Sequence, residues 1–296
     1  MSGRVRAGAF GPAQLGNGRN DRLLAVAAWT VPVLVGGVFG WLLFDLLRHG
    51  LGGLSWTFLT TAPEAAGRAG GIGPVLFSTL LILAVCLLAA VPVGMLTAVL
   101  LSGVVGRPPS QMRSTFLRSV RRSLDVLAGV PSIVFGLFGN AFFSIVLGMG
   151  FSILSGGLTL ACMVLPIFIR EAEEALRQVP AELRLSAAAL GLSRTKTLTS
   201  ILLPAALPGI TVGLVLGIGR ALAETAALIF TSGYVDRMPG SLLDSGRSLS
   251  IHIYDLSMNV AGGEPNAYAT ALVLVGLLLV INSAAASLSA RWHRRG

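Results

Sequence analysis

Charged side chains are scarce in this sequence. Only 12% of its 296 residues are Asp, Glu, Lys or Arg, whereas 54% are hydrophobic. A soluble domain carries about 25% charged residues, so a water-soluble fold of this length could not cover its surface with polar groups. The composition therefore excludes a soluble globular protein and indicates that a lipid bilayer surrounds most of the chain.

Residues that bind metals or form disulfides are also few. The two cysteines, Cys86 and Cys162, lie in apolar runs, where a small core residue is the simplest role. The three histidines share no ligand spacing, so no metal site is expected. A phosphate-binding loop of the form G-x-x-x-x-G-K-[ST] is missing as well. We therefore expect no cofactor in this chain.

Long apolar runs are what the sequence has in quantity. A helix needs about 20 residues to cross the hydrocarbon core. The runs lack the alternation of barrel strands, so we predict an all-α membrane protein with about six transmembrane helices. Because the stretch 148–157 is rich in glycine, a broken or re-entrant pair formed by the third and fourth crossings is an alternative. The predicted crossings are residues 23–47, 72–102, 124–147, 152–169, 207–231 and 267–290.

Basic residues indicate the orientation of these crossings. Of the 22 Lys and Arg residues, 17 fall in the N-terminal tail, the loops after the second and fourth crossings, and the C-terminal tail. The positive-inside rule then places both termini in the cytoplasm. We predict a mobile tail at 1–21, a transmembrane domain at 22–290 and a second tail at 291–296. Since the charges follow the membrane sides and form no aromatic-interleaved stripe, no nucleic-acid partner is expected.

The largest inside loop, residues 170–206, contains a second kind of signal. Residues 181–190 favour a short helix, and Gly191 is a plausible C-cap because it tolerates a left-handed backbone. A short helix between two spanning helices suits a docking element. An ordinary amphipathic surface helix is the alternative.

The same loop resembles a family signature. Binding-protein-dependent ABC importer permeases carry a cytoplasmic EAA loop: E-A-A, three residues, Gly, nine residues, Ile, one residue, Leu-Pro. The resemblance implies that this loop contacts an ATPase subunit, although Leu185 stands where Glu is usual and Ser186 where the first Ala is usual. The matching positions are Ala187, Gly191, Ile201, Leu203 and Pro204.

Further stretches are similar to the phosphate-specific permeases of the PstA type, over roughly residues 70–290. The resemblance implies a non-enzymatic permease for inorganic phosphate in the bacterial plasma (inner) membrane. It also implies partners: two copies of an ATPase subunit that bind ATP and Mg²⁺, a second, PstC-like permease, and an extracytoplasmic, PstS-like phosphate-binding protein. The stretches are Val179-Pro180, 129–138 (GVPSIVFGLF), 219–226 (GRALAETA), 250–254 (SIHIY) and 267–272 (AYATAL).

Two charges lie within the fifth predicted crossing. A helix there would place Arg220 and Glu224 four residues apart, on the same face as Gly209, Gly213 and Gly217. Charge within the bilayer is costly, so we expect this face at a subunit interface or a water-filled path. Arg220 suits an oxyanion because its planar fork donates two hydrogen bonds. A purely structural Arg–Glu pair remains the alternative.

Neutral donors and rival functions complete the predictions. Thr225 and Ser132 are candidate additional donors on the anion's path. A permease for sulfate or molybdate is the nearest rival, and a stand-alone secondary transporter is a more distant one. No Ser–His pair, metal cluster or carboxylate dyad in the sequence supports a membrane enzyme.

Overall fold

The computed structural model describes residues 18–103 and 111–293, most of which are helical. The chain divides into two units, residues 1–48 and 49–296, which are described separately. Helix α1 (Gly18–Gly50) covers the first predicted crossing, and every described residue between 23 and 44 is exposed. The helix begins inside the predicted tail 1–21, whose residues 1–17 lie outside the described part.

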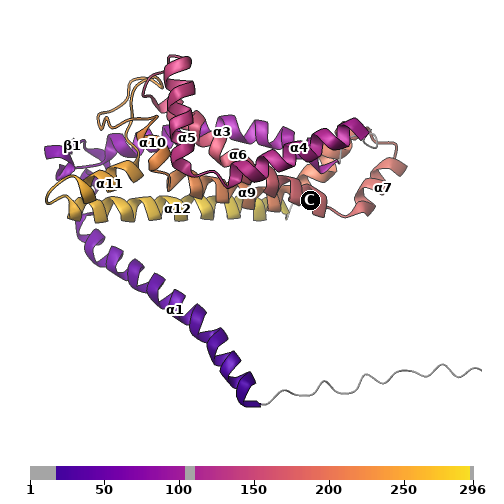
Figure 1. The fold of residues 1–296 in the computed structure, drawn as a ribbon, viewed down its shortest axis with the longest axis horizontal. Coiled ribbons are helices and arrows are strands. Elements are labelled where there is room, and N and C mark those ends of the chain that lie inside the picture. The colour runs from indigo at the N-terminus through magenta and orange to yellow at the C-terminus, as the bar shows by residue number, and fades with distance from the viewer. Residues whose placement is uncertain (1–17, 104–110, 294–296) are drawn as a thin grey trace, which may run out of the picture. The chain divides into compact units, whose positions relative to one another are not determined.

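Four long helices form the bundle of the second unit: α3 (Gly73–Ser102), α6 (Ile153–Gln178), α9 (Leu203–Leu222) and α12 (Glu264–His293) (Figure 1). Helix α6 packs against both α3 and α9. Glycines allow this close approach, since a Cβ on Gly157 would lie 2.5 Å from Cβ of Val85, and one on Gly94 would lie 2.5 Å from the ring of Phe168. The bundle core therefore forms around α6.

Together with the first, covered by α1, four predicted crossings are confirmed. The runs 72–102 and 267–290 correspond to α3 and α12, and 152–169 corresponds to α6, which continues nine residues further. Five helices of the described chain are long and apolar enough to cross a membrane, or up to six if one bent pair counts as a crossing. This agrees with the predicted number.

The third crossing, 124–147, is divided into two helices. Helix α4 (Gln111–Ala128) ends before Gly129, and α5 (Ser132–Gly139) continues into a π-helical turn, η3 (Asn140–Val146). The two halves are bent by 104°. Pro131 has no N–H to continue the helix, and it disfavours helical backbone at Val130. A sharp break therefore lies here, in addition to the loop at 147–152 that separates η3 from α6.

The fifth crossing, 207–231, is displaced toward the N-terminus. The helix starts with α8 (Arg194–Thr197), passes through a π-helical turn, η4 (Leu198–Leu202), and continues as α9. Pro204 lacks the N–H for an ordinary helical bond, and the wider turn precedes it. The helix ends at Leu222, so the prediction of one helix through Glu224 is wrong.

Smaller elements cover the two ends of the bundle. At one end lies α7 (Ala181–Ala189), within the predicted inside loop. The other end carries α11 (Leu249–Met258) and a short hairpin (Figure 1). Its strands β1 (Pro63–Glu64) and β2 (Ala69–Gly70) pair antiparallel, with Pro63 opposite Gly70. The remaining elements at this end are η1 (Leu51–Gly53), α2 (Trp56–Thr60), η2 (Ala65–Gly67) and α10 (Ala226–Ile229).

Candidate functional sites

Arg220 lies in the last turn of α9, and its residue is exposed on the surface of the chain. Gly217 packs on Val164, which is 11 residues from the start of α6. Because α9 runs antiparallel to α6, Arg220 lies three residues closer to that start. At 1.5 Å per residue, Arg220 is therefore about 12 Å inside this end of α6. No ion pair or hydrogen bond holds its guanidinium within residues 18–103 and 111–293. The chain thus presents a free cation on a spanning helix.

Glu224 is placed differently from the prediction. It lies on the connection between α9 and α10, buried, and its Oε1 accepts a hydrogen bond of 3.1 Å from the N–H of Ala227. Its carbonyl accepts the hydroxyl of Ser250 on α11 at 2.6 Å. The carboxylate therefore starts α10 and fixes the break in the helix. The predicted i,i+4 pair with Arg220 does not form in the described structure.

The glycine face of α9 also differs from the prediction. Cβ atoms added to Gly209, Gly213 and Gly217 would lie 2.6, 2.6 and 2.7 Å from Ala175, Glu171 and Val164. All three contacts are with α6 of the same chain. The glycines therefore serve packing within the chain, and the expected interface with another subunit is wrong for this face. Sequence alone shows that a helix approaches, but not which helix.

The two predicted neutral donors come from elements that touch. Thr225 immediately precedes α10, and Ser132 is the first residue of α5; both are half-buried. Helix α5 packs on α10, where a Cβ on Gly136 would lie 2.8 Å from Cα of Ala227. In the described chain no hydrogen bond joins Ser132 or Thr225 to Arg220. The structure brings their helices together without joining the side chains.

Helix α7 confirms the predicted short helix at 181–190 to within one residue, together with its end at Gly191. Gly191 has a φ of +68°, and the N–H of Leu192 donates to the carbonyl of Ala187 at 3.1 Å, which is a glycine-type helix end. Ala187 is buried, whereas Leu185 and Ser186 are exposed. Of the other signature residues, Ile201 lies in η4, and Leu203 and Pro204 begin α9.

An ion-pair network connects α4 to α6, and its pairs between the two helices were not predicted. Arg121 of α4 donates to Glu173 of α6 at 2.9 Å, and Arg177 pairs with the same Oε1 at 2.8 Å. Arg170 pairs with Asp125. These residues line a cavity of about 400 Å³. The basic loop was visible in the sequence, but its acidic partners lie about 50 residues away. The network attaches α4 to α6.

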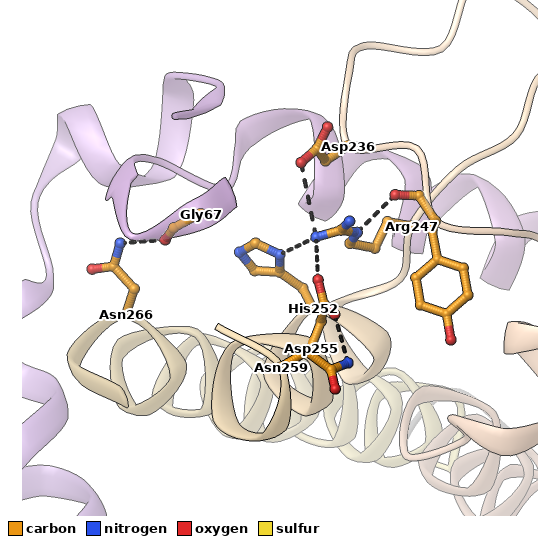
Figure 2. Close-up of polar contacts among 8 residues, drawn as sticks. Gly67, Asp236, Arg247, His252, Asp255, Asn259 and Asn266 are labelled. Carbon is orange, nitrogen blue, oxygen red and sulfur yellow. Dashed lines mark hydrogen bonds and ion pairs between the residues drawn. The ribbon is translucent and has the colours of Figure 1, made fainter. Parts of the chain in front are cut away.

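A buried arginine organises the opposite end of the bundle. Figure 2 shows Arg247 between Asp236 and Asp255, whose carboxylates lie 3.8 and 3.2 Å from its Nη1. Its Nε donates to the carbonyl of Tyr234 at 2.9 Å. The connection 231–248 is thereby fixed to α11. No pattern in the sequence distinguishes Arg247 from the other basic residues outside the crossings.

His252 completes this cluster. Nη1 of Arg247 lies 3.3 Å from its Nδ1, and since arginine only donates, that nitrogen accepts and the imidazole is neutral. Burial, followed by the nearby charge of Arg247, lowers the pKa of His252 to about 4. Its ring lies under Gly67 of the hairpin, while Asn266 donates to the Gly67 carbonyl at 2.8 Å (Figure 2).

The lowered pKa makes stability depend on pH. Unfolding returns the His252 pKa to about 6.5, so the unfolded chain gains a proton first as pH falls. The contribution of His252 to the free energy of unfolding is intact above pH 6.5 and is lost as the pH falls from 6.5 to about 4. At pH 5 the loss is about 2 kcal/mol. In His252→Asn, whose amide oxygen still accepts from Arg247, thermal unfolding in detergent should lose this part of the pH dependence. Equal pH profiles for both proteins would contradict the assignment.

The bundle around α6, with interrupted spans, has the fold of ABC importer permeases. It is similar to a chain in the crystal structure of a bacterial alginate ABC transporter with its alginate-bound periplasmic protein, at a TM-score of 0.62 and 18% identity, over 92% of this chain and 96% of that one. It is also similar to a chain of the MetNI methionine ABC transporter, at a TM-score of 0.57 and 18% identity, over 74% and 96%.

The sequence comparisons narrow the class. Residues 90–294 match the family model described as binding-protein-dependent transport system inner membrane component, and the chain belongs to this family. A probable ABC transporter permease protein, YqgI of Bacillus subtilis, is 32% identical over 91% of this chain and 92% of its own length. The phosphate transport system permease protein PstA of Mycobacterium leprae is 35% identical over 88% and 81%. The chain is a multi-pass membrane protein.

Proposed function

We propose that this chain is one of two permease subunits of an ATP-driven importer for inorganic phosphate. The observation that carries the proposal is the exposed Arg220, which lies about 12 Å inside the end of α6 and has no ion pair or hydrogen bond among the described residues. A charge facing lipid near the membrane centre costs about 2.5–3.5 kcal/mol, so this side of α9 is expected to face water or another subunit. The name of the PstA relative supports phosphate as the anion.

The proposed site assigns separate roles to the predicted residues. Arg220 binds the anion through its planar, permanently charged fork. Ser132 and Thr225 supply neutral donors from the two helices that meet beside the break. Glu224 acts as a positioning residue, because its hydrogen bond to Ala227 fixes the end of the helix that carries Arg220. An interrupted helix that lines a polar path is a common arrangement in transporters.

The surfaces of the chain support the proposed partners. A second, PstC-like permease would cover an apolar groove of about 460 Å³ between α4, α5 and α6, lined by residues that include Leu127, Phe138 and Leu165. Two copies of an ATPase subunit would bind ATP and Mg²⁺ and dock at the α7 end, in the cytoplasm with both termini. A PstS-like binding protein would deliver phosphate at the α11 end.

Uptake by the assembled transporter tests this function. Proteoliposomes that contain the chain with its native neighbours should take up labelled phosphate when ATP is supplied to the ATPase side. Excess arsenate, which has the same shape and charge, should compete at least tenfold better than sulfate or molybdate. Equal competition by sulfate would favour the other-oxyanion permease. Uptake by this chain alone along an ion gradient would favour a secondary transporter and contradict the proposal.

A further inference from the structure

Helix α7 exposes an unusual amount of apolar surface. Leu185 and Leu190 are 70% and 77% exposed, and Leu183 is 39% exposed. The helix touches its own chain through Ala187, which is 1% exposed, and through Arg184, whose Nη2 donates to the carbonyl of Leu176 at 3.0 Å. The free side of the helix is therefore built of leucine, alanine and serine, and Glu182 is its one charged residue.

The exposed leucines point to two sides of the helix. At about 100° per residue, Leu185 lies about 140° from Leu190 and about 160° from Leu183. The exposed arc, which runs from Ala188 to Leu183 around the helix, spans about 220° and lies opposite Ala187. A flat lipid surface contacts a single apolar stripe of a helix that lies on it. A concave groove contacts both flanks, and this arrangement fits such a groove.

The charges near α7 add to this description of the partner. Arg184 is directed back into its own chain by its bond to Leu176. Beyond the glycine at 191, Arg194 and Lys196 are exposed on α8. A complementary surface would therefore be apolar where it meets Leu185 and Leu190, and acidic where it meets the start of α8. Since exposed apolar patches of this kind mark protein contacts, the occupant is a soluble subunit.

We infer that Leu185 and Leu190 determine which ATPase subunit this chain accepts, by filling a groove that is apolar on both flanks and offers no cation at Leu185. The inference rests on the proposed function, which supplies the ATPase as the partner at this end. It adds the chemistry of the contact, because a carboxylate at position 185 would be buried there without a partner. Burying an unpaired charge is strongly unfavourable.

Substitutions at matched positions test the inference in the complete transporter. We expect Leu185→Glu and Leu190→Glu to lower the retention of the native ATPase, and the uptake coupled to it, at least tenfold. Leu185→Met keeps the size and apolarity and should retain far more ATPase than Leu185→Glu, while Arg237→Gln, which removes an exposed charge outside α7, should stay within twofold of the parent. Retention of Leu185→Glu at the parent level, or above it, would show a cation in the groove and overturn the inference.

A second measurement separates a groove from the membrane surface. A fluorescent label on Leu190→Cys should be shielded from water when the ATPase is bound and should not be quenched by nitroxide lipids. Strong lipid quenching that ATPase binding leaves unchanged would overturn the inference. The proposed function fails by a different result, in which the unmodified chain retains no ATPase at all.

Discussion

Replacing Arg220 by Gln is expected to lower phosphate uptake at least tenfold while membrane insertion and assembly stay near normal. A hydrogen bond to a charged group contributes about 1.5–3 kcal/mol, which corresponds to roughly tenfold to a hundredfold in binding. Folding should be little affected, because the guanidinium is exposed and unpaired in the described chain. Uptake of labelled phosphate and co-purification of the partners measure the two quantities separately.

Three further variants distinguish a substrate role for Arg220 from a structural one. Arg220→Lys keeps the charge but loses the bidentate fork, so it should be impaired as well. Glu224→Gln should assemble, because its amide oxygen still accepts from Ala227. Arg237→Gln removes an exposed arginine outside the spanning helices and is the matched control. If Arg220→Gln transports normally, or if adding Glu224→Gln restores its uptake, Arg220 has no substrate role.

Removing Arg247 should have the largest effect on stability. Arg247→Met retains an unbranched side chain but leaves Asp255 and Asp236 without their cation, and the carbonyl of Tyr234 without its donor. Loss of one partner of a fully buried ion pair costs about 3–5 kcal/mol, and the partial exposure of Asp236 and Asp255 makes this an upper bound here. We expect a lower unfolding temperature in detergent and faster proteolytic cleavage within residues 231–248.

The control for this effect lies on the same connection. Arg237 is exposed, and Arg237→Met should change the free energy of unfolding by no more than about 0.5 kcal/mol. Adding Asp255→Asn to Arg247→Met removes one of the stranded charges and should recover part of the loss. Equal stabilities for Arg247→Met and Arg237→Met would show that the buried pairs contribute nothing.

Features encoded in neighbouring residues could be predicted from the sequence. The apolar runs of α3, α6 and α12 are long enough to indicate spans by themselves. The end of α7 followed from Gly191, because a left-handed backbone at a helix end is a local property of glycine. The break at Gly129-Val130-Pro131 also had a local signal, but the apolar run continues through it, and length alone favoured a single crossing.

Features that depend on distant contacts could not be predicted. Nothing in Ala223-Glu224-Thr225 interrupts a helix by itself. The break is held by the Glu224 side chain on Ala227 and by Ser250, which lies 26 residues further along the chain. The start of the fifth span at Arg194 was hidden by Pro204, which a π-helical turn accommodates. Arg247 looked like any exposed arginine because its two carboxylates come from separate elements.

The glycine contacts of α6 determine which motions the bundle permits. A Cβ atom added to Gly209, Gly213 or Gly217, at three successive turns of α9, would lie 2.6–2.7 Å from α6. Gly157 and Gly94 allow an equally close approach between α3 and α6. Sliding α9 by one residue would drive side chains into these gaps, so the register between the helices is locked. We therefore expect α3, α6 and α9 to move together as one unit. Within the described chain, a change in the angle between α4 and α5 at the interruption 129–131 would leave these glycine contacts intact.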